Sequence, residues 1–242
     1  MNAHDIIRLL HTEILGKYMK KYITNYAYPV ITGGASVSHC ERNTHTINDI
    51  DIVFAITKPN PTAELVNKVV EDRDNLLNNI LADEALKGLP LSIRETYQIH
   101  PEYDVSAIKL VRVKFEDSVI IDTTVQSNKT NRVWNVYSSY LGKGLTHPIP
   151  YVIDKGVVYA TCGFAKYDSL RILFFFLESE NWVKVQKYLI KYLYLSGNTH
   201  MLKETLTPRE ILQKLRSDYQ FVKAERKMRS VITDFKTNVI LK

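Results

Sequence analysis

The sequence predicts an α+β protein in which a mixed sheet with flanking helices precedes a smaller helical domain. Three observations favour this class. Segments with the alternation or β-branched content of strands lie within the first 126 residues. Apolar residues at helical spacing occur between those segments and again throughout the last third of the chain. A stretch with several Gly and Pro residues, 128–151, separates the two patterns and is the expected domain boundary.

The first part of the chain alternates between helical and strand patterns. Residues 3–25 are expected to form an amphipathic helix, because apolar residues recur there near helical spacing. The elements expected next are a strand, a turn with the start of a short helix, a second strand and a long helix, at residues 28–32, 33–38, 50–56 and 62–86.

A hairpin is expected at residues 105–125. Its first strand alternates along 105–115, Glu116 and Asp117 form a tight turn, and the second strand is strongly β-prone. That second strand carries one carboxylate, Asp122, which is costly on an apolar strand unless it has a partner. Beyond the boundary, helices are expected at residues 164–177, 182–195, 208–215 and 219–239.

The composition is that of an ordinary soluble globular protein, with 45% hydrophobic and 24% charged residues among 242. No apolar run approaches the roughly 18 residues of a membrane span, so no membrane partner is expected. The N-terminus lacks the basic start and apolar core of a signal peptide. With only two cysteines, Cys40 and Cys162, we expect reduced thiols and a cytoplasmic location, although one buried disulfide is conceivable.

The net charge of +6 is unevenly distributed along the chain. Residues 160–242 hold 15 Lys and Arg against 8 Asp and Glu, whereas the preceding part is nearly balanced. A basic surplus suits contact with a triphosphate or with a nucleic-acid backbone. The alternative is that these lysines occupy the solvated faces of surface helices.

Two short motifs point to chemistry. Gly33, Gly34 and Ser36 follow the first expected strand, and glycines there let a phosphate chain approach the backbone. Asp49 and Asp51 are spaced i and i+2, so on a strand they point to the same side. Two carboxylates held side by side repel each other unless a cation lies between them.

Asp122 is the third acid of this pattern. If its strand lies beside the strand of Asp49 and Asp51, three carboxylates converge, which is enough to hold two Mg²⁺ ions. Asp122 would also be placed to take a proton from an attacking hydroxyl. Together the motifs indicate metal-assisted chemistry on a nucleoside triphosphate.

The glycine pair with Ser36, the Asp-x-Asp pair and the later strand Asp122, in this order, resemble the DNA polymerase β type nucleotidyltransferase superfamily. Asn48 stands where that family usually has Ser or Thr. The resemblance implies a polymerase β-like catalytic domain at residues 1–145. In it, Gly33, Gly34 and Ser36 would contact the triphosphate of ATP, while Asp49, Asp51 and Asp122 would be catalytic and bind Mg²⁺ or Mn²⁺.

A second resemblance concerns the expected helical domain, residues 146–242. The segment from Tyr167 to Arg171, followed by a helix rich in Lys and Tyr, is similar to the region after the catalytic domain in poly(A) polymerases of large cytoplasmic DNA viruses. It implies a nucleotide- or RNA-binding domain in viral mRNA processing.

Three residues of that Lys- and Tyr-rich helix are candidates for binding the nucleotide. Lys187 and Lys191 are four apart on one helix face and could neutralise a triphosphate, and Tyr188 could stack on a base. Core tyrosines with solvated lysines are an equal alternative. Asp168 and Arg171 are expected to form a local ion pair.

A structural alternative applies to each motif of the catalytic part taken singly. The glycines could form an ordinary turn, Asp49 and Asp51 could lie on a solvated edge strand, and Asp122 could be paired with a core arginine. All three in order favour the functional interpretation. His39, Cys40 and His45 lack the pattern of a zinc site and are expected to be loop residues.

The function expected from these features is template-independent transfer of AMP from ATP to an RNA 3′ end. The chain is short for a processive polymerase, so short tails or dependence on a protein partner subunit are expected. Two alternatives stay open. One is the same fold used by an oligonucleotide or cyclic-nucleotide synthase, or by an enzyme that nucleotidylates a protein or small molecule. The other is an inactive subunit that binds RNA or a partner.

Overall fold

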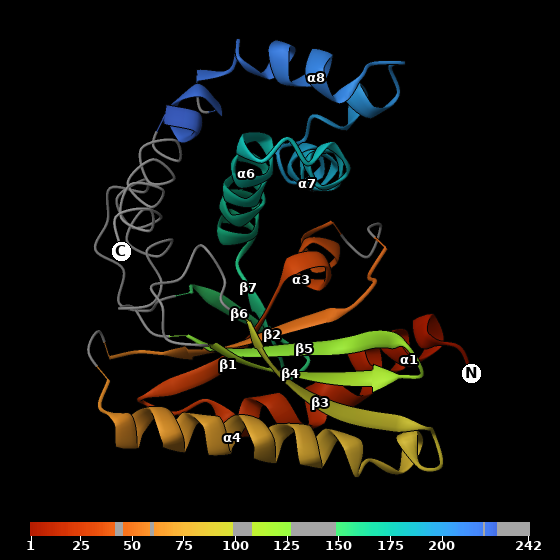
Figure 1. Ribbon diagram of the computed structural model, residues 1–242, viewed down its shortest axis with the longest axis vertical. Coiled ribbons are helices and arrows are strands. Elements are labelled where there is room, and N and C mark those ends of the chain that lie inside the picture. Colours follow the sequence, from red (N-terminus) through yellow and green to blue (C-terminus); the bar gives the residue numbers. More distant parts are fainter. Residues whose placement is uncertain (42–45, 59–60, 99–107, 127–148, 220, 227–242) are drawn as a thin grey trace. The chain divides into compact units, whose positions relative to one another are not determined.

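The computed structural model describes residues 1–41, 46–58, 61–98, 108–126, 149–219 and 221–226 (Figure 1). The chain divides into two compact units. The described part of the first unit comprises the residues up to 126 together with 149–161, and that of the second begins at Cys162. Each unit is described by itself.

The first unit is an α+β structure built on a seven-stranded mixed sheet, as the sequence predicts for the class. Its strands are β1 (Ala27–Thr32), β2 (Ile50–Ile56), β3 (Leu91–Gln98), β4 (Ile108–Phe115), β5 (Ser118–Gln126), β6 (Tyr151–Asp154) and β7 (Val157–Ala160). Their spatial order is β3-β4-β5-β2-β1-β7-β6. The β2–β5 and β1–β7 pairs are parallel and the other neighbours are antiparallel. The central position of β2 places Asp51, its one acid, inside the sheet.

The helices of the first unit begin with an irregular N-terminal segment. It runs through α1 (Ala3–Leu9), a π-helical turn (Leu10–Ile14), α2 (Leu15–Tyr18) and a 3₁₀ turn (Met19–Tyr22). The single helix predicted at residues 3–25 is thus four short pieces that end at Tyr22. The two longer helices are α3 (Gly33–Cys40) and α4 (Ala63–Leu81). The helix predicted at residues 62–86 corresponds to α4 followed by a separate 3₁₀ turn (Glu84–Leu86). In Figure 1, α4 lies along one face of the sheet and α3 lies on the opposite side.

Alternation along β4 and β5 explains how the sheet separates core from polar side chains. Val111, Val113 and Ile121 are buried, whereas Arg112 and Asp122 on the alternate positions are partly exposed. Both α1 and α4 contact β5 and cover the apolar side. The other side of these two strands is therefore available to polar residues.

Several predicted elements are confirmed and several are missed. The strands at 50–56 and 118–125 match β2 and β5 closely, whereas β3, β6 and β7 are not predicted. Residues 105–107 of the predicted hairpin lie outside the described residues. Both β6 and β7 follow the predicted boundary at residue 145 and belong to the sheet of the first unit.

The second unit is described from Cys162 onward and is helical there. Its elements are α6 (Cys162–Glu178), α7 (Trp182–Leu195), a 3₁₀ turn (Thr199–Leu202) and α8 (Pro208–Leu215). Residues 221–226 are also helical, and the rest of the helix predicted to extend to 239 lies outside the described residues. The predicted role of this part in binding nucleotide or RNA stays a prediction.

Two further expectations concern the cysteines and membranes. Both cysteines, Cys40 and Cys162, are disulfide-bonded, so the expectation of reduced thiols is wrong for this structure. Within the described ranges, every helix is too short or too polar to span a bilayer.

The turn between β6 and β7 crosses the N-terminal segment at a pair of glycines. Gly156 has φ of 84°, and a Cβ there would lie 2.2 Å from the carbonyl oxygen of Gly16. A Cβ on Gly16 would lie 2.3 Å from the carbonyl oxygen of Lys155. Because backbone atoms occupy both places, neither position has room for a side chain.

Gly156→Ala should lower the free energy of unfolding by about 3 kcal/mol, because backbone strain and a backbone clash add together. Gly88→Ala is the matched control, since Gly88 has φ of 79° and nothing within 4 Å of its Cβ position. That control should cost about 1–2 kcal/mol, the strain alone. Urea unfolding measures both. Equal losses in the two variants would show that the β6–β7 turn does not pack on Gly16.

Candidate active site

The first motif lies where β1 turns into α3. Gly33, the first residue of α3, has φ of 61°, and a Cβ built on it would lie 1.9 Å from Oδ2 of Asp51. Asp51 is the register partner of Thr32, the last residue of β1. The carboxylate therefore lies against the first turn of α3, where the helix dipole stabilises negative charge. The structure thus brings the predicted glycine turn and the second predicted acid together.

Two of the three predicted acids lie on the neighbouring strands β2 and β5. Asp51 and Asp122 are register partners on these parallel neighbours, so their side chains share one face of the sheet. Asp49 lies one residue before β2. Burial raises the pKa of Asp122 above its ordinary value, Arg112 opposes the rise, and the negative charge of Asp49 adds to it. The carboxylates of Asp49 and Asp122 therefore lie within electrostatic reach of each other.

The two oxygens of Asp122 have different surroundings. Oδ2 accepts a hydrogen bond from Nε of Arg112 on β4 at 3.1 Å, and the two residues are register partners. Oδ1 is buried, and it has no hydrogen-bond partner in the described part of the chain. The arginine pairing foreseen in the structural alternative is therefore present. The solvated edge strand foreseen with it is wrong, because β2 lies between β5 and β1.

A divalent cation fits this site in part. Mg²⁺ and Mn²⁺ prefer carboxylate oxygens, and the buried, unpartnered Oδ1 of Asp122 is an oxygen that a cation would satisfy. Across the described ranges, however, no group of three His, Cys, Asp or Glu residues is placed to hold one ion together. The ligand set Asp49, Asp51 and Asp122 accordingly stays a prediction.

Ser36 lies within α3 rather than at its first turn. Its side chain is fully buried, and its hydroxyl donates a hydrogen bond to the carbonyl of Ala160 at 3.2 Å. The hydroxyl therefore ties α3 to the end of β7. Contact of Ser36 with a triphosphate stays a prediction. For that contact, the hydroxyl would have to give up its hydrogen bond to the Ala160 carbonyl. Gly34 is buried beside it in the first turn.

The other end of α3 is held by an aromatic cluster that the sequence did not indicate. His39 belongs to α3, not to a loop as predicted, and its ring stacks on Tyr159 of β7 at a centroid distance of 3.9 Å. His45 lies outside the described residues. The Tyr159 hydroxyl meets Nε2 of His11 at 2.9 Å, and Nδ1 of His39 lies 3.8 Å from the Asp154 carboxylate. This cluster joins α3 to the N-terminal segment and to the β6–β7 hairpin.

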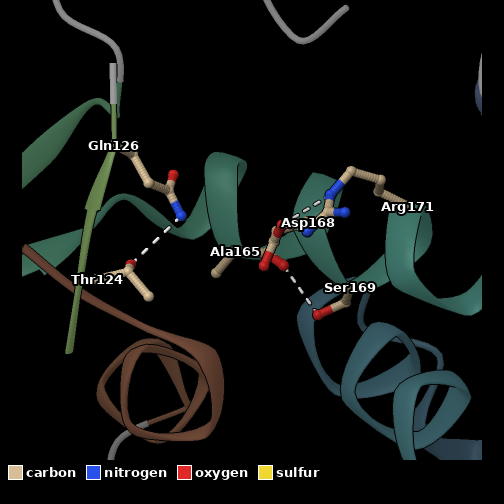
Figure 2. Close-up of polar contacts among 6 residues, drawn as sticks. All are labelled: Thr124, Gln126, Ala165, Asp168, Ser169 and Arg171. Carbon is tan, nitrogen blue, oxygen red and sulfur yellow. Dashed lines mark hydrogen bonds and ion pairs between the residues drawn. The ribbon is translucent and has the colours of Figure 1, made fainter. Parts of the chain in front are cut away.

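Polar side chains continue along β5 beyond Asp122 on the same face. Nε2 of Gln126 donates to Oγ1 of Thr124 at 3.4 Å (Figure 2). Because these residues are spaced by two from Asp122, the strand presents a polar row that begins at the acid.

In the second unit, Asp168 and Arg171 form the local ion pair that the sequence predicts. Nε and Nη2 of Arg171 donate to Oδ1 of Asp168 at 3.1 and 2.9 Å, and the Ser169 hydroxyl donates to the carbonyl of Ala165 one turn earlier (Figure 2). Burial raises the pKa of Asp168 to about 6, against the positive charge of Lys191. The pair is a half-buried feature of α6.

The predicted nucleotide-binding residues of α7 differ in exposure. Lys187 and Tyr188 are half-buried, whereas Lys191 is buried with its Nζ 5.0 Å from the centre of the Tyr188 ring. Tyr188 also stacks on Phe176 of α6 at 5.9 Å. Tyr192 is buried in the helix packing, as the core alternative foresaw. Lys191 therefore contacts the side chain of Tyr188 rather than solvent.

The residue that sequence reasoning missed at the site is Arg112. The signal was available, since Arg112 and Lys114 share one face of an alternating strand directly before the Asp122 strand. The sequence did not indicate the strand register that pairs Arg112 with Asp122. A register shift between Val113 and Lys114 contributes to that pairing.

Comparisons with known proteins found a distant structural likeness. No family model matches the sequence, and no curated protein matches it. Among solved structures, the chain is similar to the crystal structure of the Megavirus polyadenylate synthase, with 12% identity and a TM-score of 0.49. The match covers 84% of this chain and 35% of that one, so this chain spans about a third of its length.

The Gly33–Asp51 contact predicts a coupled loss of stability. Gly33→Ala should destabilise the protein by about 3 kcal/mol, because the new Cβ meets the carboxylate and the backbone is strained. In an Asp51→Ala background the nearest remaining side-chain atom is Cβ of Asp51 at 3.4 Å, so the same change should cost 1–2 kcal/mol less. Urea unfolding of the four proteins gives the coupling energy. Strict additivity would contradict the contact.

The His11–Tyr159 contact predicts a pH dependence of stability. Burial, and then the neighbouring His39, lower the pKa of His11 below its ordinary 6.5. The unfolded chain therefore binds the proton more tightly, and the free energy of unfolding should fall as pH drops below about 6.5, by at most about 1.4 kcal/mol per pH unit. His11→Gln should flatten this fall, whereas exposed His4→Gln should not. Urea unfolding between pH 5 and 7.5 tests it, and identical curves for the two variants would oppose it.

Proposed function

We propose that the protein is a nucleotidyltransferase that adds AMP from ATP to the 3′ end of RNA without a template. One observation carries the proposal. The glycine turn at the start of α3 lies against Asp51, and Asp51 is paired with Asp122 on the adjacent parallel strand. The N–H groups at a helix start suit the phosphates of ATP, and carboxylates suit Mg²⁺ or Mn²⁺. The motif order in the sequence supports the same assignment.

The proposed division of roles follows from position. Gly33 and Gly34 bring the backbone of α3 close to the triphosphate, and Ser36 holds α3 on β7. Asp49 and Asp51, completed by Asp122, would bind the divalent cation, which when bound lowers the pKa of the acceptor hydroxyl and offsets phosphate charge. Oδ1 of Asp122, which has no hydrogen-bond partner among the described residues, would accept the proton of the 3′-hydroxyl as that hydroxyl attacks the α-phosphorus and pyrophosphate leaves.

Residues outside the acid row complete the proposal. Lys187 and Tyr188 of α7 remain candidates for the nucleotide, and Lys191 is assigned to positioning the Tyr188 ring. A cytoplasmic location, a role in viral mRNA processing and a protein partner subunit belong to the proposal as well. An oligonucleotide or cyclic-nucleotide synthase, or an enzyme that modifies a protein or small molecule, would use the same acids with another acceptor.

A second candidate function is a catalytically inactive subunit that binds RNA or a partner. The Arg112–Asp122 ion pair favours it, because the chain's own cation already neutralises one of the three carboxylates. In that case the pair is structural, and the row of acids would not take up a divalent ion.

The test is incubation of the purified protein with Mg²⁺, each labelled nucleoside triphosphate in turn, and a short single-stranded RNA, followed by a denaturing gel. A ladder with ATP supports terminal transfer. Label in a small product or on the protein moves the function to a synthase or modifying enzyme. No incorporation anywhere, with RNA or partner binding retained, supports the inactive subunit.

Asp122→Ala should abolish transfer while leaving ATP binding largely unchanged. Loss of the proton acceptor and of one ligand should lower the rate by roughly a thousandfold, since several kcal/mol of transition-state stabilisation disappear. Asp117→Ala, an exposed change in the β4–β5 turn, is the control and should retain full activity. Equal loss of ATP binding and of transfer in Asp122→Ala would contradict this division of roles.

A further inference from the structure

One face of the β3–β4 pair is basic, and it continues the row of acids. Arg94 on β3 is the register partner of Arg112 on β4, Arg112 is the partner of Asp122, and Asp122 is the partner of Asp51. Paired positions on neighbouring strands present their side chains on the same face. Two cations and two carboxylates therefore follow one another across four adjacent strands. Lys114 lies two residues beyond Arg112, on the same face.

The cations of this face are available for binding. Arg94 is exposed and Lys114 is half-buried, and in the ranges that the structure describes neither takes part in an ion pair. Arg112 is partly exposed, with 31% of its side chain accessible, although it pairs with Asp122. The alternating positions on this face, as far as the side chains are described, are Ser92, Arg94, Leu110, Arg112 and Lys114. None of them is acidic.

The distances suit a chain of phosphates. Neighbouring strands lie about 4.8 Å apart, so Arg94 on β3 stands about 10 Å from Asp122 on β5. A polyanionic strand crossing the sheet would place one or two phosphates over Arg94 and Lys114 and its end near Asp122. An exposed cation without a carboxylate partner gains more from a phosphate than one already paired.

We propose that this basic face, formed by Arg94, Arg112 and Lys114, binds the sugar–phosphate backbone of the single-stranded acceptor and directs its 3′-hydroxyl to Asp122. The inference rests on the proposed function, and it places the acceptor on the sheet of the first unit. Arg112 then has two tasks, because it holds the Asp122 carboxylate and contributes charge to the acceptor path. Charge complementarity assigns the face to a nucleic-acid backbone, which supplies regularly spaced phosphates.

The experiment measures binding of a fluorescent 15-nucleotide oligo(A), as RNA and as DNA, by anisotropy without ATP or divalent ions. The test variant is Arg94→Gln with Lys114→Gln. At 0.1 M salt its affinity should fall roughly 20-fold, and the slope of log K against log salt should become shallower by about 1.4, the value for two phosphate contacts. RNA and DNA should respond alike, because the contacts are to the backbone.

Lys20→Gln with Lys58→Gln is the matched control, since both side chains are exposed, neither forms an ion pair within the described residues, and the charge change is the same. It should keep the affinity within about twofold. Equal losses in the two double variants, or an unchanged test variant, would overturn the proposal. So would a wild-type protein that binds an acidic polypeptide but no single strand. Because binding is read without ATP, failure of the proposed transfer reaction shows separately, as absent incorporation on the gel.

Discussion

The close approach of Gly33 to the Asp51 carboxylate is the constraint on which the candidate site depends. A carboxylate oxygen of Asp51 occupies the place that a side chain on Gly33 would need, and the backbone of Gly33 has a positive φ. The chain can therefore turn from β1 into α3 over this acid only at glycine. The turn places the start of α3 beside β2, and the β2–β5 register then places Asp122 beside Asp51.

Carboxylates inside a sheet need opposite charge nearby, and the structure supplies it from two sources. The first turn of α3 offers its dipole to Asp51, and Arg112 offers a hydrogen bond to one oxygen of Asp122. The second oxygen of Asp122 stays buried and unpartnered in the described part of the chain, at a cost that a bound cation or an acceptor hydroxyl would relieve. The fold thus stabilises Asp51 and one oxygen of Asp122, whereas the other oxygen of Asp122 would be stabilised by a bound ligand.

Local pattern was sufficient for the long strands β2 and β5 and insufficient for the edge strand β6. The apolar run of β2 and the β-prone run of β5 are visible in the sequence because both strands bury side chains on at least one face. The edge strand β6 exposes Val152 and Ile153, so its pattern carries no core signal. The N-terminal segment keeps helical spacing, yet it changes between α, π and 3₁₀ geometry, and its Gly16 packs against the β6–β7 turn.

By itself, the sequence determined the α+β class, the glycine turn and the three acids, because these depend on local spacing and on residue chemistry. Only the tertiary structure decided which side chains meet. The register of β4 on β5 pairs Arg112 with Asp122, packing of α3 on β7 buries Ser36, and α7 buries Lys191 beside Tyr188. Strand register and helix packing depend on contacts between segments far apart in the chain, and such contacts leave no mark on the spacing within any one segment.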